Sequence, residues 1–158
     1  MDQIPVTKYG FDRLEAELKD LKSVQRPAVI EAIAEARAHG DLSENAEYHA
    51  AREQQSFIEG RIMELEAVIG KAQVIDPATL SGKTVKFGAT VEIYDEDTDE
   101  ESTYQIVGDY EADTESGKIS ISAPMARGLI GKAEGDSVKI TTPKGAKNYE
   151  IVSVRFQS

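Results

Sequence analysis

Two long apolar stripes with helical spacing, joined by a short turn, constrain the fold of this chain more than any other feature. The first lies in residues 8–38 and opens with members three or four residues apart: Phe11, Leu14, Leu18 and Leu21. It resumes in a shifted phase after Pro27, with Val29, Ile30, Ile33 and Ala36. Proline lacks an amide hydrogen and clashes with the preceding turn, so we predict a kink or break near Arg26 and Pro27.

The second stripe, in residues 42–71, has the regular spacing of a coiled-coil seam. Its members step by four and three residues, with one polar exception: Ala51, Gln55, Ile58, Ile62, Leu65, Ile69 and Ala72. Two helices of roughly 30 residues each span about 45 Å. Because the connection is short, they are predicted to fold back as an antiparallel hairpin arm whose tip lies near residues 40–45.

From Val85 onward the spacing of the apolar residues changes from that of helices to that of strands. Segments rich in β-branched and aromatic residues alternate with turn residues. The predicted strand segments are 85–95, 102–109, 118–123, 136–142 and 148–156. Residues 124–132 read as one short helix between strands. The sequence therefore predicts an α+β chain with three parts: a coiled-coil hairpin arm in 1–76, a linker in 77–83, and a mostly antiparallel sheet domain in 84–158.

Composition excludes several classes of protein. The net charge is −11, and both parts are acidic, with 9 basic and 15 acidic residues up to residue 76 and 9 and 14 beyond it. Tight non-specific binding to duplex nucleic acid is therefore not expected. The chain has no cysteine, so disulfides and thiolate metal sites are excluded. No apolar run is long enough to span a bilayer and no signal peptide is evident, so we expect a cytoplasmic location without membrane association.

Asp41 and Glu44 stand at the turn between the two predicted helices. An acid followed three residues later by glutamate resembles a capping box, in which Asp41 accepts from backbone amides and Glu44 reaches back to the first amide. The alternative to this capping role is that the acids bind a metal ion. Together with Glu47 they place several carboxylates at the end of an arm, with too few ligands to hold Mg²⁺ alone but enough to share an ion with another molecule.

Arg37 and Arg52 flank the same turn. Arg37 suits the end of a helix, where a cation interacts favourably with the helix dipole. Arg52 has no acidic neighbour three or four residues away, and the structural interpretation is that it packs against Tyr48. The functional interpretation is a small basic patch that contacts RNA phosphates or stacks on a base. A zinc site built from His39, His49 and Asp41 matches no recurrent spacing.

The sheet domain carries no catalytic constellation that we recognise. Both histidines of the chain lie near the predicted turn, so no Ser-His-Asp or Cys-His site fits within residues 84–158. Residues 94–101 only faintly resemble a calcium loop, since Glu100 and Ile106 replace the required glycine and glutamate. The domain is therefore predicted to be a docking module.

Two segments carry a resemblance to a known family. "EARAHGDLSENAEYHAAREQQ" resembles the arm tip of the bacterial transcript cleavage factors, the GreA/GreB family, and "ISAPMARGLIGKAEGD" resembles their C-terminal signature. The resemblance covers the whole chain. One departure is Ala123, where the family usually has serine. The implied fold is an N-terminal antiparallel coiled-coil hairpin followed by an FKBP-like antiparallel-sheet domain.

The resemblance also implies an activity. Such factors bind RNA polymerase at its secondary channel and stimulate the polymerase's own cleavage of backtracked RNA, so the chain is expected to have no active site of its own. Asp41 and Glu44 match the catalytic and metal-binding acids, and Arg37 and Arg52 match the RNA-binding patch. Pro124, Met125 and Arg127 fall in the expected polymerase-docking loop.

The expected partners are RNA polymerase and the 3′ end of backtracked nascent RNA. Mg²⁺ is expected to be shared with the polymerase active site, with no cofactor bound stably by the free protein, which is expected to be a monomer. One alternative is a secondary-channel regulator that does not cleave. Another is a prolyl isomerase, because FKBP-like domains include them, but the aromatic residues here occupy strand-like positions rather than a deep cleft.

Overall fold

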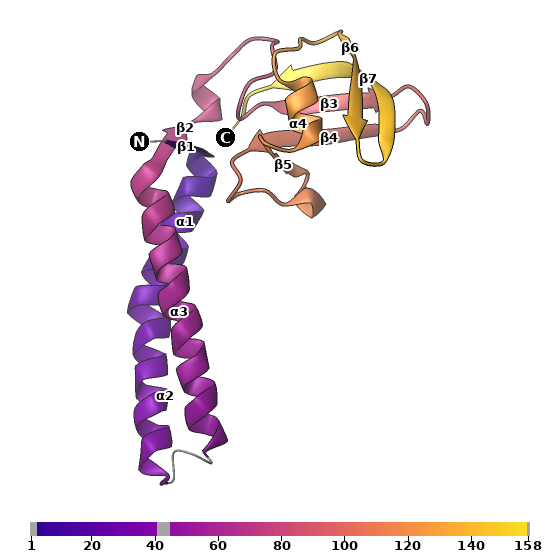
Figure 1. Ribbon diagram of the computed structural model, residues 1–158. Helices are drawn as coiled ribbons and strands as arrows, with labels where there is room; N and C mark the ends of the chain where they lie inside the picture. Colours follow the sequence, from indigo (N-terminus) through magenta and orange to yellow (C-terminus); the bar gives the residue numbers. More distant parts are fainter. Residues whose placement is uncertain (1–2, 41–44, 158) are drawn as a thin grey trace. The chain divides into compact units, whose positions relative to one another are not determined.

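The computed structural model describes residues 3–40 and 45–157, and it divides into two compact units. One unit is Phe11–Ala72, and the other combines the residues up to Gly10 with those from Gln73 onward (Figure 1). The helical unit is thus shorter than the predicted span of 1–76, because the N-terminal residues group with the second unit. Each unit is described by itself below.

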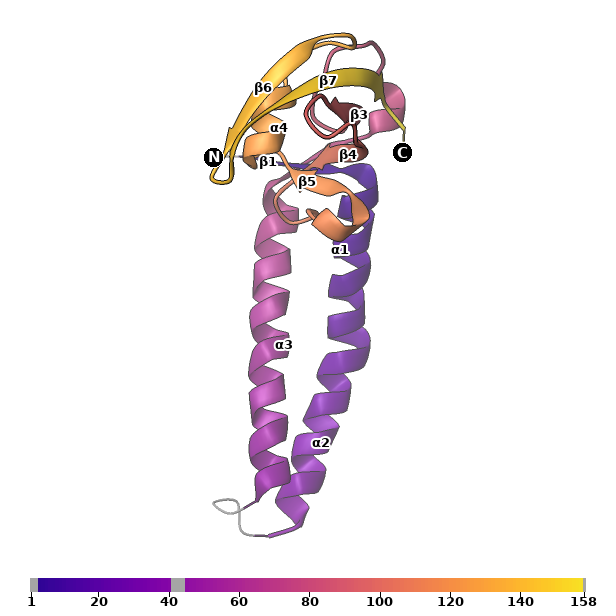
Figure 2. The ribbon, with the colours of Figure 1, turned by 90° about the vertical axis from the view of Figure 1, so that its right-hand side faces the viewer.

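The helical unit is an antiparallel hairpin. Its first limb consists of α1 (Lys8–Asp20), a π-helical turn η1 (Leu21–Gln25) and α2 (Arg26–Ala38), and its second limb is α3 (Ala46–Lys71). Both ribbon views show the two limbs lying side by side (Figures 1 and 2). The predicted coiled-coil hairpin is confirmed.

The phase shift in the first stripe is absorbed by the π turn. The buried residues of this limb are spaced seven, eight and seven apart: Leu14, Leu21, Val29 and Ala36. One extra residue would rotate the seam away from α3 in a regular helix, whereas a π turn accommodates it, and here the amide of Arg26 bonds the carbonyl of Leu21. Pro27 follows directly and has no amide hydrogen to donate. Of the predicted kink or break near Arg26 and Pro27, the break is wrong because the chain stays helical, and the irregularity there is the π turn.

The opposite limb buries the predicted face with one change. Ala51, Ile58, Ile62 and Leu65 are buried as expected, but the last position is Val68, which is 3 % exposed, while Ile69 is only partly buried. The regular heptad spacing therefore holds over most of α3 and moves by one residue near its end.

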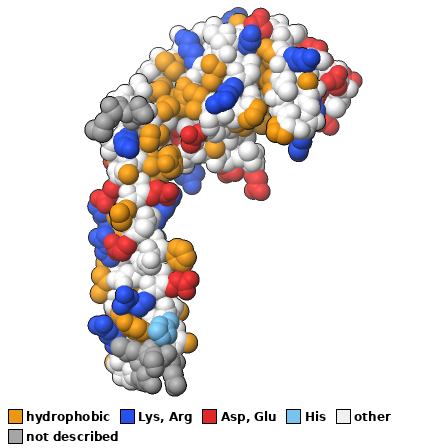
Figure 3. Space-filling view, viewed as in Figure 1, with side chains coloured by type: hydrophobic (Ala, Val, Ile, Leu, Met, Phe, Trp, Pro, Cys, Tyr) orange, Lys and Arg blue, Asp and Glu red, His pale blue; other side chains and the backbone are white. Residues whose placement is uncertain are grey.

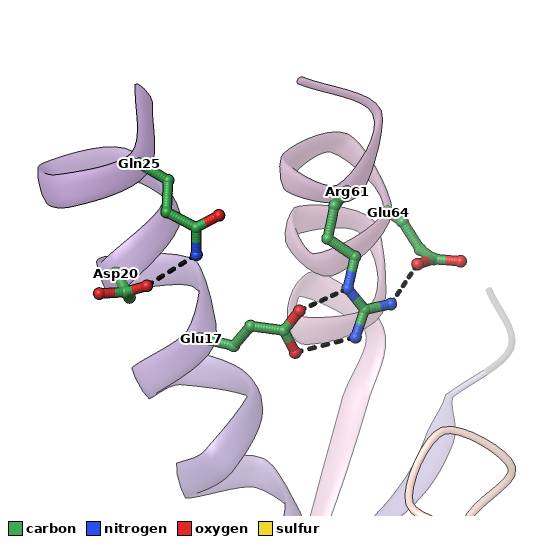
Figure 4. Close-up of polar contacts among 5 residues, drawn as sticks. All are labelled: Glu17, Asp20, Gln25, Arg61 and Glu64. Atoms are coloured by element: carbon green, nitrogen blue, oxygen red, sulfur yellow. Dashed lines mark hydrogen bonds and ion pairs between the residues drawn. The ribbon is translucent and has the colours of Figure 1, made fainter. Parts of the chain in front are cut away.

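Ion pairs flank the apolar seam and join the limbs. The guanidinium of Arg61 donates from Nε to Glu17 Oε2 at 2.6 Å and from Nη2 to Glu17 Oε1 at 2.8 Å, and it also pairs with Glu64 (Figure 4). Arg26 forms the same two-pronged contact with Glu59, at 2.8 and 2.7 Å. Such forked contacts add geometric specificity, so they help to set the alignment of the two limbs.

One consequence is a dependence of stability on pH. The hydrogen bond from Arg61 lowers the pKa of Glu17 below its ordinary value. A carboxylate with a lowered pKa stabilises the folded state above its unfolded pKa of about 4.3, and this contribution is lost as pH falls through the folded value. We expect Glu17→Gln to destabilise the hairpin at pH 7, by less than about 1 kcal/mol because the pair is partly exposed, and to have little effect at pH 3.

The measurement is urea unfolding at both pH values, followed by helical circular dichroism. Glu15→Gln, which changes an exposed carboxylate on the same helix, is the matched control. An equal effect of Glu17→Gln at pH 7 and pH 3 would contradict the role of the ion pair.

The second unit is built on a five-stranded sheet with the order β5-β4-β3-β7-β6. The strands are β3 (Thr90–Asp95), β4 (Glu101–Val107), β5 (Lys118–Ser120), β6 (Ser137–Thr142) and β7 (Gly145–Arg155). All neighbours pair antiparallel except β4 and β5, and β7 is bulged opposite Glu92 and Ile93. The predicted α+β fold is confirmed, and each predicted strand segment overlaps one of these strands, although β4 and β7 begin before their predicted segments.

Helix α4 (Pro124–Leu129) closes the core of this unit. Its residues Ala126 and Leu129 are fully buried against strand residues that include Val91, Ile140 and Ile151. The short helix predicted in 124–132 is therefore confirmed. Two further strands, β1 (Ile4–Thr7) and β2 (Ala72–Ile75), form a separate two-stranded sheet that the sequence pattern did not predict.

A residue from far along the chain supports the N-cap of α1. Thr7 Oγ1 accepts from the amide of Gly10 at 3.1 Å, as an N-cap residue does. The Thr7 amide donates to Glu111 Oε2 at 3.0 Å, a bond usually made by a glutamate three residues after the cap. That position is Gly10, where a β-carbon would lie 1.9 Å from Glu111 Oε1. The missing side chain leaves the space that Glu111 occupies.

Candidate functional site

One asparagine joins the two helices where the hairpin turns. Asn45 is the N-cap of α3, and its Oδ1 accepts from the amide of Tyr48 at 3.0 Å. Its Nδ2 donates at 2.6 Å to the carbonyl of Ala36 near the end of α2, which also accepts from the amide of His39 at 3.2 Å. A single side chain thus completes the ends of both helices.

This geometry bears on the predicted acids. Asn45, not Asp41, is the N-cap of α3, and the described helix begins at Ala46 rather than Leu42. Asp41 and Glu44 lie outside the described residues. Their proposed part in catalysis and metal binding stays a prediction.

The predicted RNA-binding arginines lie around one tyrosine. The guanidinium carbon of Arg37, from α2, and that of Arg52, from α3, each lie 5.9 Å from the ring centre of Tyr48. Arg52 Nη1 also donates to the Tyr48 hydroxyl at 3.1 Å. We call Arg37, Tyr48 and Arg52 the basic cluster. The packing of Arg52 against Tyr48, one of the two interpretations of the sequence, is confirmed.

The electrostatics of the basic cluster follow from this arrangement. The hydrogen bond from Arg52, reinforced by the positive charges of Arg52 and Arg37, lowers the pKa of the Tyr48 hydroxyl. The electron-rich face of an aromatic ring attracts cations, so Tyr48 can hold two like charges near one another. His49 packs edge-on against the same ring, with the ring centres 5.5 Å apart. The cluster is therefore a local cationic site on an acidic protein.

A groove adjoins the basic cluster between α2 and α3. It has a volume of about 460 Å³ and is lined by Ile30, Ile33, Ala34, Arg37, Arg52 and Gln55. Ile30 is 51 % exposed, although it is a large aliphatic residue. Figure 3 shows hydrophobic and basic side chains next to one another near the lower end of the hairpin. The sequence pattern did not predict this groove, because it requires the two limbs to be placed side by side.

The predicted docking residues lie on or next to α4. Pro124 is its first residue and is exposed, Arg127 is exposed, and Met125 packs partly against the core. The N-cap, Ala123, makes no side-chain capping bond. The buried face of α4 thus anchors the helix while Pro124 and Arg127 face solvent, and their docking role stays a prediction.

Among residues 3–40 and 45–157, no group of three acidic or histidine side chains is placed to hold a metal ion. Within the same residues, no helix is long and apolar enough to cross a membrane.

The fold and the site together define a two-part factor, with a helical hairpin that ends in a cationic cluster and a sheet unit that presents a short helix. Comparison with known protein families gives the same division into two parts. Residues 4–74 match the family "Transcription elongation factor, N-terminal", and residues 80–156 match "Transcription elongation factor, GreA/GreB, C-term". The chain therefore belongs to the GreA/GreB family of transcription elongation factors.

Relatives from several bacteria match along the whole chain. Transcription elongation factor GreA of Cereibacter sphaeroides is 67 % identical over 156 residues, and that of Paracoccus denitrificans is 64 % identical, each match covering 99 % of both chains. Among solved structures, the GreA factor homolog Gfh1 of Thermus thermophilus is 27 % identical, with a TM-score of 0.45 over 97 % of this chain and 99 % of that one. The Cereibacter and Paracoccus relatives are both named as transcription elongation factors.

Proposed function

We propose that this chain binds RNA polymerase through its secondary channel and stimulates the polymerase's own endonucleolytic cleavage of backtracked RNA. The observation that carries the proposal is the basic cluster, whose arginines flank Asp41 and Glu44 in the sequence of a member of the elongation-factor family. The factor supplies side chains to an active site that belongs to the polymerase, so it activates that site in trans.

The carboxylates act on the reacting atoms. Two-metal hydrolysis of a phosphodiester uses one ion to activate water and another to stabilise the leaving oxygen. Asp41 and Glu44 would contribute oxygen ligands to a more weakly held Mg²⁺ of the polymerase, and one of them would orient or deprotonate the attacking water. The activity is then conditional on docking, because neither carboxylate can hold the ion alone.

The basic cluster offsets the repulsion between these acids and RNA. Bare carboxylates repel phosphates, whereas a guanidinium binds phosphate oxygens through paired hydrogen bonds. Arg37 and Arg52 hold the extruded 3′ segment of the RNA while Asp41 and Glu44 reach the scissile bond. Pro124, Met125 and Arg127 contact the rim of the channel.

The test uses a stalled, backtracked elongation complex with end-labelled RNA and Mg²⁺. The protein is expected to shorten the RNA by releasing a 3′ fragment, and the remaining complex is expected to resume elongation. Binding is checked separately, by competition with a labelled copy of the chain. Binding without cleavage would favour the alternative, a secondary-channel regulator that does not cleave.

The paired substitution Arg37→Gln/Arg52→Gln tests the RNA contact. We expect the protein concentration for half-maximal cleavage to rise about tenfold, because two phosphate contacts are lost, and its dependence on salt to become shallower. Lys19→Gln/Lys71→Gln is the matched control, since it removes the same charge from positions on α1 and α3 that lie away from the basic cluster. Equal losses in the two double variants would show a general effect of net charge.

A further inference from the structure

We propose that the groove beside the basic cluster binds one nucleotide of the extruded RNA, with its base against Ile30, Ile33 and Ala34 and its phosphate at Arg37 and Arg52. The inference rests on the proposed function, which brings RNA to this end of the hairpin. It adds a contact to the base, so cleavage would depend on more than the RNA backbone.

The size and lining of the groove suit a small planar group. Its volume of about 460 Å³ falls within the range of about 300–1,000 Å³ typical of small-ligand sites. Its apolar wall comes from three residues of α2, and Ile30 remains 51 % exposed there. A bound base would remove this aliphatic surface from water, which is favourable in proportion to the area covered.

The charges define the orientation of the nucleotide. Arg37 and Arg52 come from different helices, and both line the groove while sharing the ring of Tyr48. Two neighbouring guanidinium groups favour a group with several anionic oxygens, such as phosphate. Ile30 lies two helical turns before Arg37, about 10 Å along α2, so the apolar wall extends away from the cationic end.

A polar group completes the match to a nucleotide. Gln55 lines the groove from α3, and its amide offers both a donor and an acceptor to the edge of a base. A nucleotide joins a flat, weakly polar base to a phosphate through a ribose, and the groove joins an apolar wall to two cations. A peptide segment of the polymerase with an acidic end is the competing occupant, and the experiment below separates the two.

The experiment combines a change in the protein with a change in the RNA. Ile30→Thr is compared with Val24→Thr, which alters an exposed aliphatic residue of the same limb outside the groove. Each variant is assayed on backtracked complexes whose extruded segment carries either normal bases or stabilised abasic residues. Circular dichroism melting confirms that both variants fold.

With normal RNA, Ile30→Thr is expected to raise the concentration for half-maximal cleavage about fivefold, while Val24→Thr leaves it unchanged. With abasic RNA, the concentration of wild-type chain for half-maximal cleavage is expected to rise by the same factor. Ile30→Thr is expected to cause no further rise on this RNA. Equal effects of Ile30→Thr on both RNAs would assign the groove to a protein segment and overturn the proposal, as would the absence of any effect.

A second readout does not depend on cleavage. With 4-thiouridine in the extruded segment, a light-induced crosslink to α2 between Ile30 and Arg37 is expected, and it should weaken in Ile30→Thr. Absence of this crosslink overturns the inference even if cleavage is stimulated. If the crosslink forms but no cleavage follows, the groove proposal stands and the proposed function fails.

Discussion

Replacing Asp41 and Glu44 together by alanine is expected to abolish stimulated cleavage, with a fall in rate on the order of 100- to 1,000-fold. The loss is this large because the two carboxylates act directly on the metal ion and the attacking water. Binding to the polymerase is expected to persist, since the docking residues on α4 are unchanged. The measurement is single-turnover cleavage of a backtracked complex at saturating protein.

The amide variants separate the two interpretations of these acids. Asp41→Asn/Glu44→Gln keeps the shape of both side chains and removes their charge. Asparagine caps helices about as well as aspartate, so a structural role would survive this change, whereas a metal ligand would be lost. We expect the amide variant to be as inactive as the alanine variant, and retained activity would contradict the metal-ligand role.

Stability provides the control for this prediction. The N-cap of α3 is Asn45, which neither variant alters. Both double variants are therefore expected to unfold within about 0.5 kcal/mol of the wild-type chain, as surface substitutions usually do. A large loss of stability would mean that the inactivity comes from a damaged hairpin.

The helical hairpin could be predicted well because its periodicity is local. Leu14, Leu21, Ala51 and Ile58 repeat at helical spacing, and each is buried. The same pattern revealed a shift of phase near Pro27 but not its form, since a break and a π turn both absorb one residue. The sequence stripe thus specified which residues face the opposite limb, while the backbone geometry depended on packing.

The candidate site was predicted less completely, because its contacts join residues from different helices. Arg37 and Arg52 were recognised by charge, but the placement of both against Tyr48 requires α2 and α3 to be adjacent. Asn45 could have been predicted as the N-cap of α3, since asparagine is a preferred N-cap residue. The capping box was assigned instead to the acidic pair Asp41 and Glu44. The role of Glu111 had no local signal, because its partner Thr7 lies 104 residues away.

Gly108→Ala is expected to destabilise the sheet unit by about 2–4 kcal/mol. A β-carbon at this position would lie 2.3 Å from the carbonyl oxygen of Pro5, well inside contact distance. The obstacle is backbone of β1 rather than a mobile side chain, so β1 must move away. That movement would strain the bonds that Glu111 accepts from the amides of Gly108, at 2.8 Å, and Thr7, at 3.0 Å. The N-cap of α1 would be weakened as a result.

Gly60→Ala is the matched control, because it makes the same chemical change with the opposite expected sign. A β-carbon at Gly60 meets no atom within 4 Å, and the residue lies inside α3. Alanine favours a helix over glycine by about 1 kcal/mol, so this variant should be more stable. Urea unfolding followed by circular dichroism measures both variants. If Gly108→Ala unfolds like the wild-type chain, β1 does not pack against Gly108 in solution, and the distant cap supplied by Glu111 loses its support.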